Sequence, residues 1–170
     1  MLVELERTNL FLTPLDEERK WYRYHHLFAE VLLNRLKQDQ PDALSELHLR
    51  ASEWYEQNGL PFEAVNHALA AQLYGRAASL VEKIAPTMIQ RSELARLLFW
   101  LDALPDDEVQ ARPLLALYFC WGLFLSGKVQ QTITRLEAVE ARFATNEIDH
   151  HPEIQGHVAA IRAYLVRETG

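Results

Sequence analysis

Cysteine, glycine and long apolar runs are scarce in this sequence of 170 residues. The single cysteine, Cys120, excludes an intramolecular disulfide and favours the reducing cytoplasm as the location. No apolar run reaches the roughly 18 residues of a transmembrane helix. The first apolar residues are followed at once by Glu4, Glu6 and Arg7, so a secretory signal is not expected. We therefore expect a cytoplasmic protein without a membrane partner.

The remaining composition is that of a helical globular protein. Hydrophobic residues make up 49% of the chain, which excludes the class of highly charged disordered chains. Leucine, alanine, glutamate and arginine dominate and only six glycines occur, which favours helices over sheets. The formal net charge of −7 makes the chain a poor electrostatic match for the phosphate backbone of DNA. We expect no direct DNA binding by these residues.

The first forty residues have a pattern of their own. Residues 2–10 are expected to form a short helical tail, and residues 11–15 form an apolar run interrupted by Pro14, as in a short strand. A charged turn over residues 16–19 precedes the alternating aromatics Trp21, Tyr22 and Tyr24, which are typical of a second strand. A helix with an apolar stripe is expected from about His25. This order predicts the end of a winged-helix module, with a β-hairpin and a helix, over residues 1–40.

Beyond Pro41 the sequence predicts one helix after another. Asp42 is placed to cap the first of these helices, Gly59 to end it, and Pro61 to open the next. Pro86 and Pro105 are expected to follow helix ends. The acidic residues 106–108 are expected to open a further helix. The expected helices span residues 42–58, 61–71, 73–85, 92–103, 113–126, 129–143 and 152–168. Because their connections are short, consecutive helices should lie antiparallel.

Two similar segments indicate a repeat. Trp54 lies near the end of one expected helix and is followed by Gly59, and Trp121 lies near the end of another and is followed by Gly127. The two glycines are 68 residues apart. That separation is two periods of a tetratricopeptide repeat, which is about 34 residues long. Position 93, where an intermediate copy would have its glycine, is Glu93, so that copy is degenerate. We predict an all-α fold over residues 41–170, a tetratricopeptide-like α-α superhelix that follows the winged-helix end. An irregular helical bundle is the alternative.

Residues 5–12 (LERTNLFL) and 21–28 (WYRYHHLF) carry a resemblance to a known family. The chain resembles the MalT-type, ATP-dependent regulators of the LuxR family of transcription factors. In that family a helix of the pattern Tyr-His-x-Leu-Phe passes into a segment Ala-x2-Trp-Tyr-x3-Gly, as Ala51, Trp54, Tyr55 and Gly59 do here. The family order is a P-loop ATPase, a winged helix, a tetratricopeptide-like sensor superhelix and a DNA-reading helix-turn-helix. The resemblance implies an internal segment of a signal-transducing ATPase of the STAND class.

The same resemblance implies what this segment binds. The family's superhelix senses a small-molecule effector, binds regulatory proteins and takes part in self-association. No Gly-x4-Gly-Lys-Ser/Thr loop occurs in these 170 residues, and no basic recognition helix follows Ile148. We therefore expect no cofactor in this segment. ATP or ADP and DNA would bind the full-length parent through domains outside it.

His25 is the candidate for a nucleotide contact. In the signalling ATPases a Met-His-Asp-Leu motif opens a winged-helix helix, and its histidine contacts the β-phosphate of ADP. Tyr24, His25, His26 and Leu27 are similar to that motif, with His26 in place of the aspartate. A histidine beside a helix N-terminus suits an anion. The resemblance thus implies that His25 contacts ADP in the full-length protein only. The alternative is that His25 caps or packs at the start of its helix.

Metal binding and catalysis find little support in the sequence. His150, His151 and His157 are close in sequence to Asp149, but Pro152 is expected to start a helix directly after the pair, so the imidazoles need not converge on zinc. His48 and His67 are interpreted as single histidines on helices. Cys120 lies in an apolar segment that keeps a thiol inert. We assign no metal ligands and no catalytic residues, and we expect no enzymatic activity.

Trp100, Tyr118 and Trp121, with Phe124, are the candidates for an effector or partner surface. Their rings would suit a sugar or a peptide if they lined the concave face of the superhelix. The alternative is packing in the core, where large aromatics are common.

Three hypotheses of function remain open on the sequence. The first is an internal, non-catalytic segment of a transcription activator that senses an effector and relays its signal. The second is a tetratricopeptide-like adaptor that binds a partner's helix or peptide and is unrelated to transcription. A histidine-metal enzyme is the third and least favoured.

Overall fold

The computed structural model describes residues 11–18, 22–143 and 152–169. The chain divides into two compact units, Met1–Leu47 and His48–Gly170. The division falls inside helix α3 (Pro41–Gln57), whereas the sequence placed a boundary between residues 40 and 41. The expected helical tail over residues 2–10 lies outside the described residues.

The first unit contains the predicted hairpin and helix. Strand β1 (Leu12–Pro14) pairs antiparallel with β2 (Tyr22–Tyr24), so that Leu12 lies opposite Tyr24. Helix α2 (His26–Asp39) follows directly. The amide of His25 donates to the carbonyl of Phe11 at 2.6 Å, and the Phe11 ring lies 5.3 Å from that of Phe28. These contacts join the hairpin to the start of the helix.

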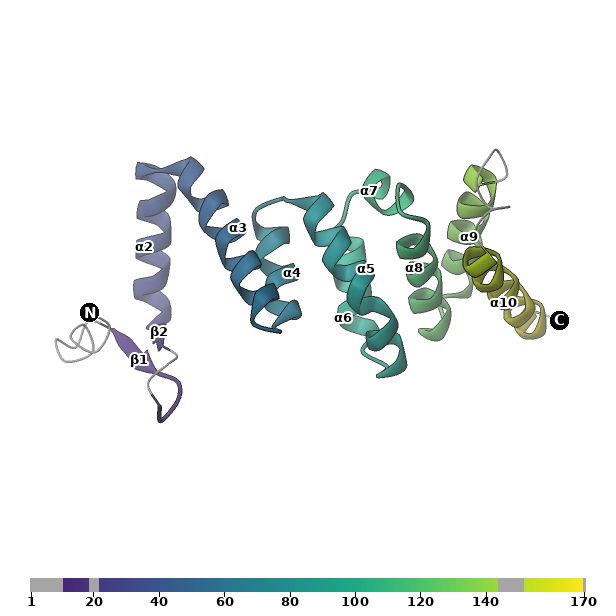
Figure 1. The fold of residues 1–170 in the computed structure, drawn as a ribbon, viewed down its shortest axis with the longest axis horizontal. Helices are drawn as coiled ribbons and strands as arrows, with labels where there is room; N and C mark the ends of the chain where they lie inside the picture. Colours follow the sequence, from purple (N-terminus) through teal and green to yellow (C-terminus); the bar gives the residue numbers. More distant parts are fainter. Residues whose placement is uncertain (1–10, 19–21, 144–151, 170) are drawn as a thin grey trace. The chain divides into compact units, whose positions relative to one another are not determined.

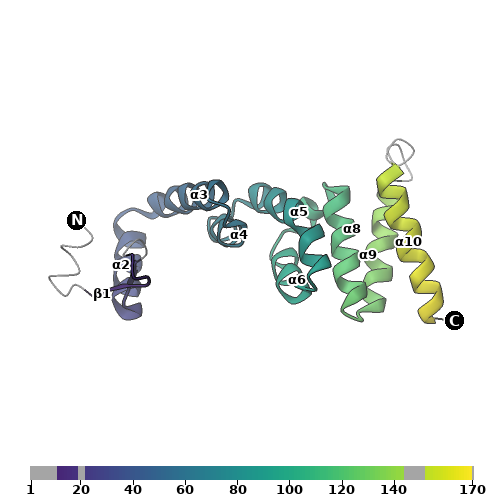
Figure 2. The ribbon, with the colours of Figure 1, turned by 60° about the horizontal axis from the view of Figure 1, so that its bottom comes forward.

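The second unit and the segment leading into it are helical, as the sequence predicted (Figure 1). After α3 come α4 (Pro61–Ala70), α5 (Tyr74–Gln90), α6 (Leu94–Asp102), α7 (Asp106–Gln110), α8 (Pro113–Leu125), α9 (Val129–Phe143) and α10 (Pro152–Thr169). Figure 2 shows α8, α9 and α10 side by side, and the three helices contact one another. The fold is therefore all-α beyond the short hairpin. No helix within the described ranges has the length and apolar character needed to span a membrane.

Two expected helix boundaries are wrong. Helix α5 does not end before Pro86 but continues to Gln90 with the proline inside it. Pro86 lacks the N–H that would bond to the preceding turn. Met88, however, lies beyond the proline with an exposed fraction of 1%, and its burial stabilises the continued helix. Helix α3 begins at Pro41, one residue before the expected start at residue 42.

One type of turn ends four of the helices. Gly59, Gln72, Ser92 and Gly127 all have positive φ, between 56° and 74°. At each of these turns the next amide donates at 2.9 Å to the carbonyl five residues earlier, which is a Schellman cap. The bonds run from Leu60 to Tyr55, Leu73 to Ala68, Glu93 to Met88, and Lys128 to Leu123.

The pair α5 and α6 has a turn of this type close to the position expected for the middle copy. Its left-handed residue is Ser92, which lies 33 residues after Gly59 and 35 before Gly127. The sequence comparison failed because it looked for a glycine at position 93. The left-handed residue of this turn lies one position earlier than expected, and it is a serine and not a glycine. Helices α3–α4, α5–α6 and α8–α9 therefore form three pairs with similar turns.

The core of the second unit lies between these pairs. Small residues in α4 and α5 allow the two helices to approach closely; they are Ala64, Ala68, Ala77 and Ala78, each with an exposed fraction of 0%. In α8, Gly122 faces α6, because a Cβ at this position would lie 3.1 Å from Cδ2 of Leu98. Large side chains such as Trp100 and Phe119 fill the remaining volume.

Candidate functional site

Three helices of the second unit enclose a groove with aromatic walls, here called the aromatic groove. It lies between α5, α8 and α10 and has a volume of about 490 Å³. This volume lies within the usual range for ligand sites, about 300–1,000 Å³. Its lining residues are Pro86, Ile89, Gln90, Tyr118, Trp121, Leu125, Glu153 and His157.

Tyr118 and Trp121 are the two aromatic side chains of this groove that the sequence had singled out. They lie three residues apart on α8 and so share one face of the helix. The indole N–H of Trp121 donates to Nδ1 of His157 at 3.0 Å, and the rings of Tyr118 and His157 meet edge to face at 6.0 Å. His157 therefore joins α10 to both aromatic residues of α8.

One carboxylate, that of Glu153, lines the groove. Burial raises the pKa of the Tyr118 hydroxyl, and the negative charges of Glu153 and Glu82 raise it further. Both effects disfavour ionisation of the Tyr118 hydroxyl, which would place a second negative charge in the groove. Tyr118 is thus a neutral hydrogen-bonding group at neutral pH.

A cluster of rings extends the aromatic surface along α10. Tyr164 lies 6.1 Å from Trp121 and 5.8 Å from Phe124, measured between ring centroids. The guanidinium carbon of Arg167 lies 5.6 Å from the centroid of the Tyr164 ring. Tyr164 is 44% exposed, so part of this aromatic surface is open to solvent.

Trp100, the third aromatic candidate, lies elsewhere. Its exposed fraction is 1%, its Nε1 donates to Oδ1 of Asn66 at 2.9 Å, and its ring meets Phe62 edge to face. Trp100 thus packs α6 against α4 and does not reach the aromatic groove. The sequence showed that it is aromatic and helical but not which face of α6 it occupies.

His25 lies at the N-cap position of α2 and its side chain is exposed. The imidazole makes no capping hydrogen bond to the helix, which has 14 residues, and it lies 4.4 Å from the ring of His26. The cap interpretation of His25 therefore finds no side-chain bond to support it. The phosphate contact stays a prediction.

Of the histidines considered as metal ligands, only His157 is among the described residues. His150 and His151 lie outside the described residues, while His157 is the partner of Trp121. Across the described ranges, no three side chains of the types His, Cys, Asp and Glu are placed to hold a metal ion. Cys120 is fully buried, and burial raises the pKa of its thiol to about 12. It is therefore a protonated core residue at neutral pH.

His48 and His67 are paired, which corrects their interpretation as single histidines. Their Nδ1 atoms lie 2.8 Å apart, across α3 and α4. One Nδ1 must donate while the other accepts, so the two Nδ1 atoms do not both carry a proton in this geometry. The ring of Tyr55 stacks on His67 with 5.3 Å between centroids. Burial lowers the pKa of His67, and the neighbouring His48 lowers it further against an opposing effect of Glu63.

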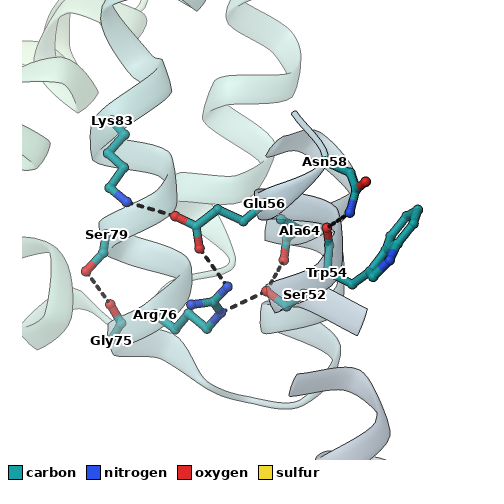
Figure 3. A network of polar contacts seen from close by, with 9 residues as sticks. All are labelled: Ser52, Trp54, Glu56, Asn58, Ala64, Gly75, Arg76, Ser79 and Lys83. Carbon is teal, nitrogen blue, oxygen red and sulfur yellow. Dashed lines mark hydrogen bonds and ion pairs between the residues drawn. The ribbon is translucent and has the colours of Figure 1, made fainter. Parts of the chain in front are cut away.

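A polar network links α3 to α4 and α5 (Figure 3). Arg76 lies between two residues of α3, donating to Oγ of Ser52 at 2.9 Å and to Oε2 of Glu56 at 2.8 Å. Lys83 donates to the other carboxylate oxygen of Glu56 at 2.8 Å. Ser52 in turn donates to the carbonyl of Ala64 at 2.8 Å.

This network holds the first helix pair against the second. Ser52 has an exposed fraction of 0%, so its hydroxyl must find partners within the protein. The hydrogen bond from Lys83 is the main cause that lowers the pKa of Glu56. Desolvation by burial opposes it, and the hydrogen bond from Arg76 lowers the pKa further. The sequence did not reveal the network, because its bonded partners are 12 to 27 residues apart.

Comparison with known proteins places this architecture in a family. Residues 1–44 match the MalT winged helix domain. The whole chain aligns with HTH-type transcriptional regulators MalT, at 33% identity over 169 residues in Yersinia enterocolitica and 32% over 170 residues in Yersinia pestis. The chain is of the MalT type. The described hairpin and helix are thus the end of a MalT winged helix, and the helical pairs align with the MalT sequence that follows it.

The MalT-type segment covers only a small part of these relatives. The alignments span 99–100% of this chain but 19% of each MalT protein. A serine/threonine-protein kinase, PknK of Mycobacterium tuberculosis, is 38% identical over 125 residues, which are 74% of this chain and 11% of that protein. No solved structure matches the chain.

Proposed function

We propose that this MalT-type segment is the effector-sensing, signal-transducing and protein-interaction region of an ATP-dependent, LuxR-family transcription regulator. Its helix pairs are of the tetratricopeptide-like kind and form the start of a sensor superhelix. The segment itself performs no catalysis. A small-molecule effector, a regulatory protein or a second copy of the regulator binds it, and the parent protein acts in the cytoplasm.

The observation that carries this proposal is the alignment of the entire chain with MalT regulators across the junction of winged helix and helical pairs. The repeated Schellman turns support a superhelix, since they recur at nearly constant spacing in three helix pairs. The aromatic groove supplies a surface of ligand size between the pairs. Tyr118 and Trp121 are the residues we assign to effector or partner binding.

We further propose a nucleotide role for His25 in the complete regulator, where ATP or ADP binds a domain outside this segment. The imidazole is exposed at the N-terminus of a 14-residue helix, where N–H groups and the helix dipole attract an anion. The His25→Ala variant of the complete protein should retain ADP less well and show higher basal activity. The His26→Ala variant is the matched control. Unchanged ADP retention in His25→Ala contradicts this role.

The relation to the kinase PknK favours a second candidate function. The segment would then be an interaction module that serves different output domains and has no necessary link to transcription. In this case it binds a helix or peptide of a partner protein.

The gene sequence on either side of the segment separates the two candidates. We expect a P-loop upstream and a helix-turn-helix with a basic recognition helix downstream. A stop codon directly after Gly170, with a native start at Met1, contradicts the regulator and supports the adaptor.

A further inference from the structure

The aromatic groove differs from two neighbouring grooves in having no cationic side chain among its lining residues. The groove between α7, α8 and α9 contains Arg135 beside Asp102 and Asp106, and that between α4 and α5 contains Lys83 and Arg91 beside two glutamates. The residues that line the aromatic groove include the carboxylate of Glu153 but no lysine or arginine. The charge of this groove is therefore complementary to a cationic group.

The shape of the groove also suits a cation that carries an apolar neighbour. Tyr118 and Trp121 offer aromatic rings, the surface that attracts lysine and arginine through cation–π contacts. Pro86, Ile89 and Leu125 supply an apolar wall. The same contact already occurs nearby within this chain, where the guanidinium carbon of Arg135 lies 3.8 Å from the ring centroid of Phe119.

His157 does not oppose this charge in the observed geometry. An indole N–H is only a donor, so Nδ1 of His157 accepts from Trp121 and carries no proton. The ring is neutral while this bond exists, and the bond fixes the orientation of the Trp121 ring. The chain's formal net charge of −7 further favours the approach of a cationic partner.

We propose that the aromatic groove binds a peptide segment of a partner protein in which an arginine or lysine stands next to an apolar side chain. This inference rests on the proposed role of the segment in protein interaction and names the chemistry of the partner. The cation lies against Tyr118 and Trp121 with Glu153 as its counter-charge. The apolar side chain packs on Pro86 and Leu125.

The test uses a fluorescein-labelled peptide of alternating leucine and arginine, with fluorescence anisotropy on the full 170-residue chain. Matched peptides of leucine with glutamine and of leucine with glutamate are the controls. The arginine peptide should bind and the other two should not. The Glu153→Gln variant should raise the dissociation constant roughly fivefold, which corresponds to about 1 kcal/mol.

The variant Glu53→Gln controls for the loss of charge alone. Glu53 is an exposed glutamate on α3, outside the aromatic groove, and its replacement removes the same charge. It should leave the dissociation constant unchanged. Trp121→Leu should weaken binding as well, because it keeps an apolar side chain but removes the ring.

Any of three results overturns the inference. Equal binding of the glutamine peptide shows that the groove does not select a cation, and equal effects of Glu153→Gln and Glu53→Gln place the peptide elsewhere. Absence of binding by the arginine peptide also overturns it. The proposed function fails separately, through the flanking gene sequence described above.

Discussion

The indole N–H of Trp121 donates a hydrogen bond to Nδ1 of His157 across 3.0 Å. Trp121 belongs to α8 and His157 to α10, so this bond joins two helices that are separated by α9 in the chain. It also sets the orientation of the largest ring of the aromatic groove. A conformational change that moves α10 relative to α8 must therefore alter the groove.

The variant His157→Phe tests the contribution of this bond. Phenylalanine keeps a planar ring but leaves the indole N–H without its acceptor, which should lower the free energy of unfolding by about 1 kcal/mol. Urea unfolding of the chain measures the change. His26→Phe, at an exposed histidine of α2, should have little effect. Equal stability of His157→Phe and the unmodified chain shows that the bond contributes nothing.

Glycine should be more stable than serine at position 92. Its φ of 58° lies in the left-handed region, where a side chain is strained and glycine is not. We expect Ser92→Gly to raise the free energy of unfolding by roughly 0.5–1 kcal/mol. Ser126→Gly is the matched control, because Ser126 ends α8 with a φ of −89° and should lose a little stability. A destabilised Ser92→Gly variant contradicts the assignment of the turn.

The Arg76 network should be more important for stability than an exposed ion pair. Arg76→Met removes one hydrogen-bond partner from the buried Ser52 hydroxyl and one from the carboxylate of Glu56. The expected loss is about 1–2 kcal/mol in chemical unfolding. Arg35→Met removes the exposed pair with Asp39 and should cost less than about 0.5 kcal/mol. Similar losses in both variants would show that the network adds nothing beyond surface charge.

The pair of His48 and His67 predicts a pH dependence of stability. Burial lowers the pKa of His67 below its ordinary value of 6.5, with a further contribution from His48 and an opposing one from Glu63. As the pH falls below 6.5, the unfolded chain therefore binds a proton before the folded chain does. The stability that the neutral His67 provides is complete above that pH and is lost as the pH falls through the pKa of the folded state.

Thermal unfolding across this pH range measures the effect. The melting temperature of the unmodified chain should fall more steeply on acidification below pH 6.5 than that of His67→Gln. His26→Gln, which removes an exposed histidine, should follow the unmodified chain. Parallel curves for the unmodified chain and His67→Gln would rule out a role of the pair.

Local signals in the sequence predicted most of the helices and the hairpin. Gly59 and Gly127 mark turns because glycine adopts positive φ without strain, and the alternating aromatics before His25 indicated the second strand. Pro86 misled the prediction, since tertiary burial of Met88 outweighs the missing N–H. Ser92 hid the third turn because serine carries no signal for the left-handed region.

The candidate site was only partly accessible from the sequence. The pattern showed Tyr118 and Trp121 on one face of a helix, but it could not show that Trp100 points into the core. The pairing of His48 with His67 and of Trp121 with His157 depends on how distant helices pack. Such pairings leave no local periodicity to detect.

We propose that this segment relays a signal between a nucleotide switch and the helical pairs. Hydrogen–deuterium exchange of the complete regulator, with ADP and with a non-hydrolysable ATP analogue, tests it most directly. We expect amide protection to differ between the two nucleotide states both at the start of α2 and in α8 and α10 around the aromatic groove. Identical exchange of α8 and α10 in the two states would contradict it.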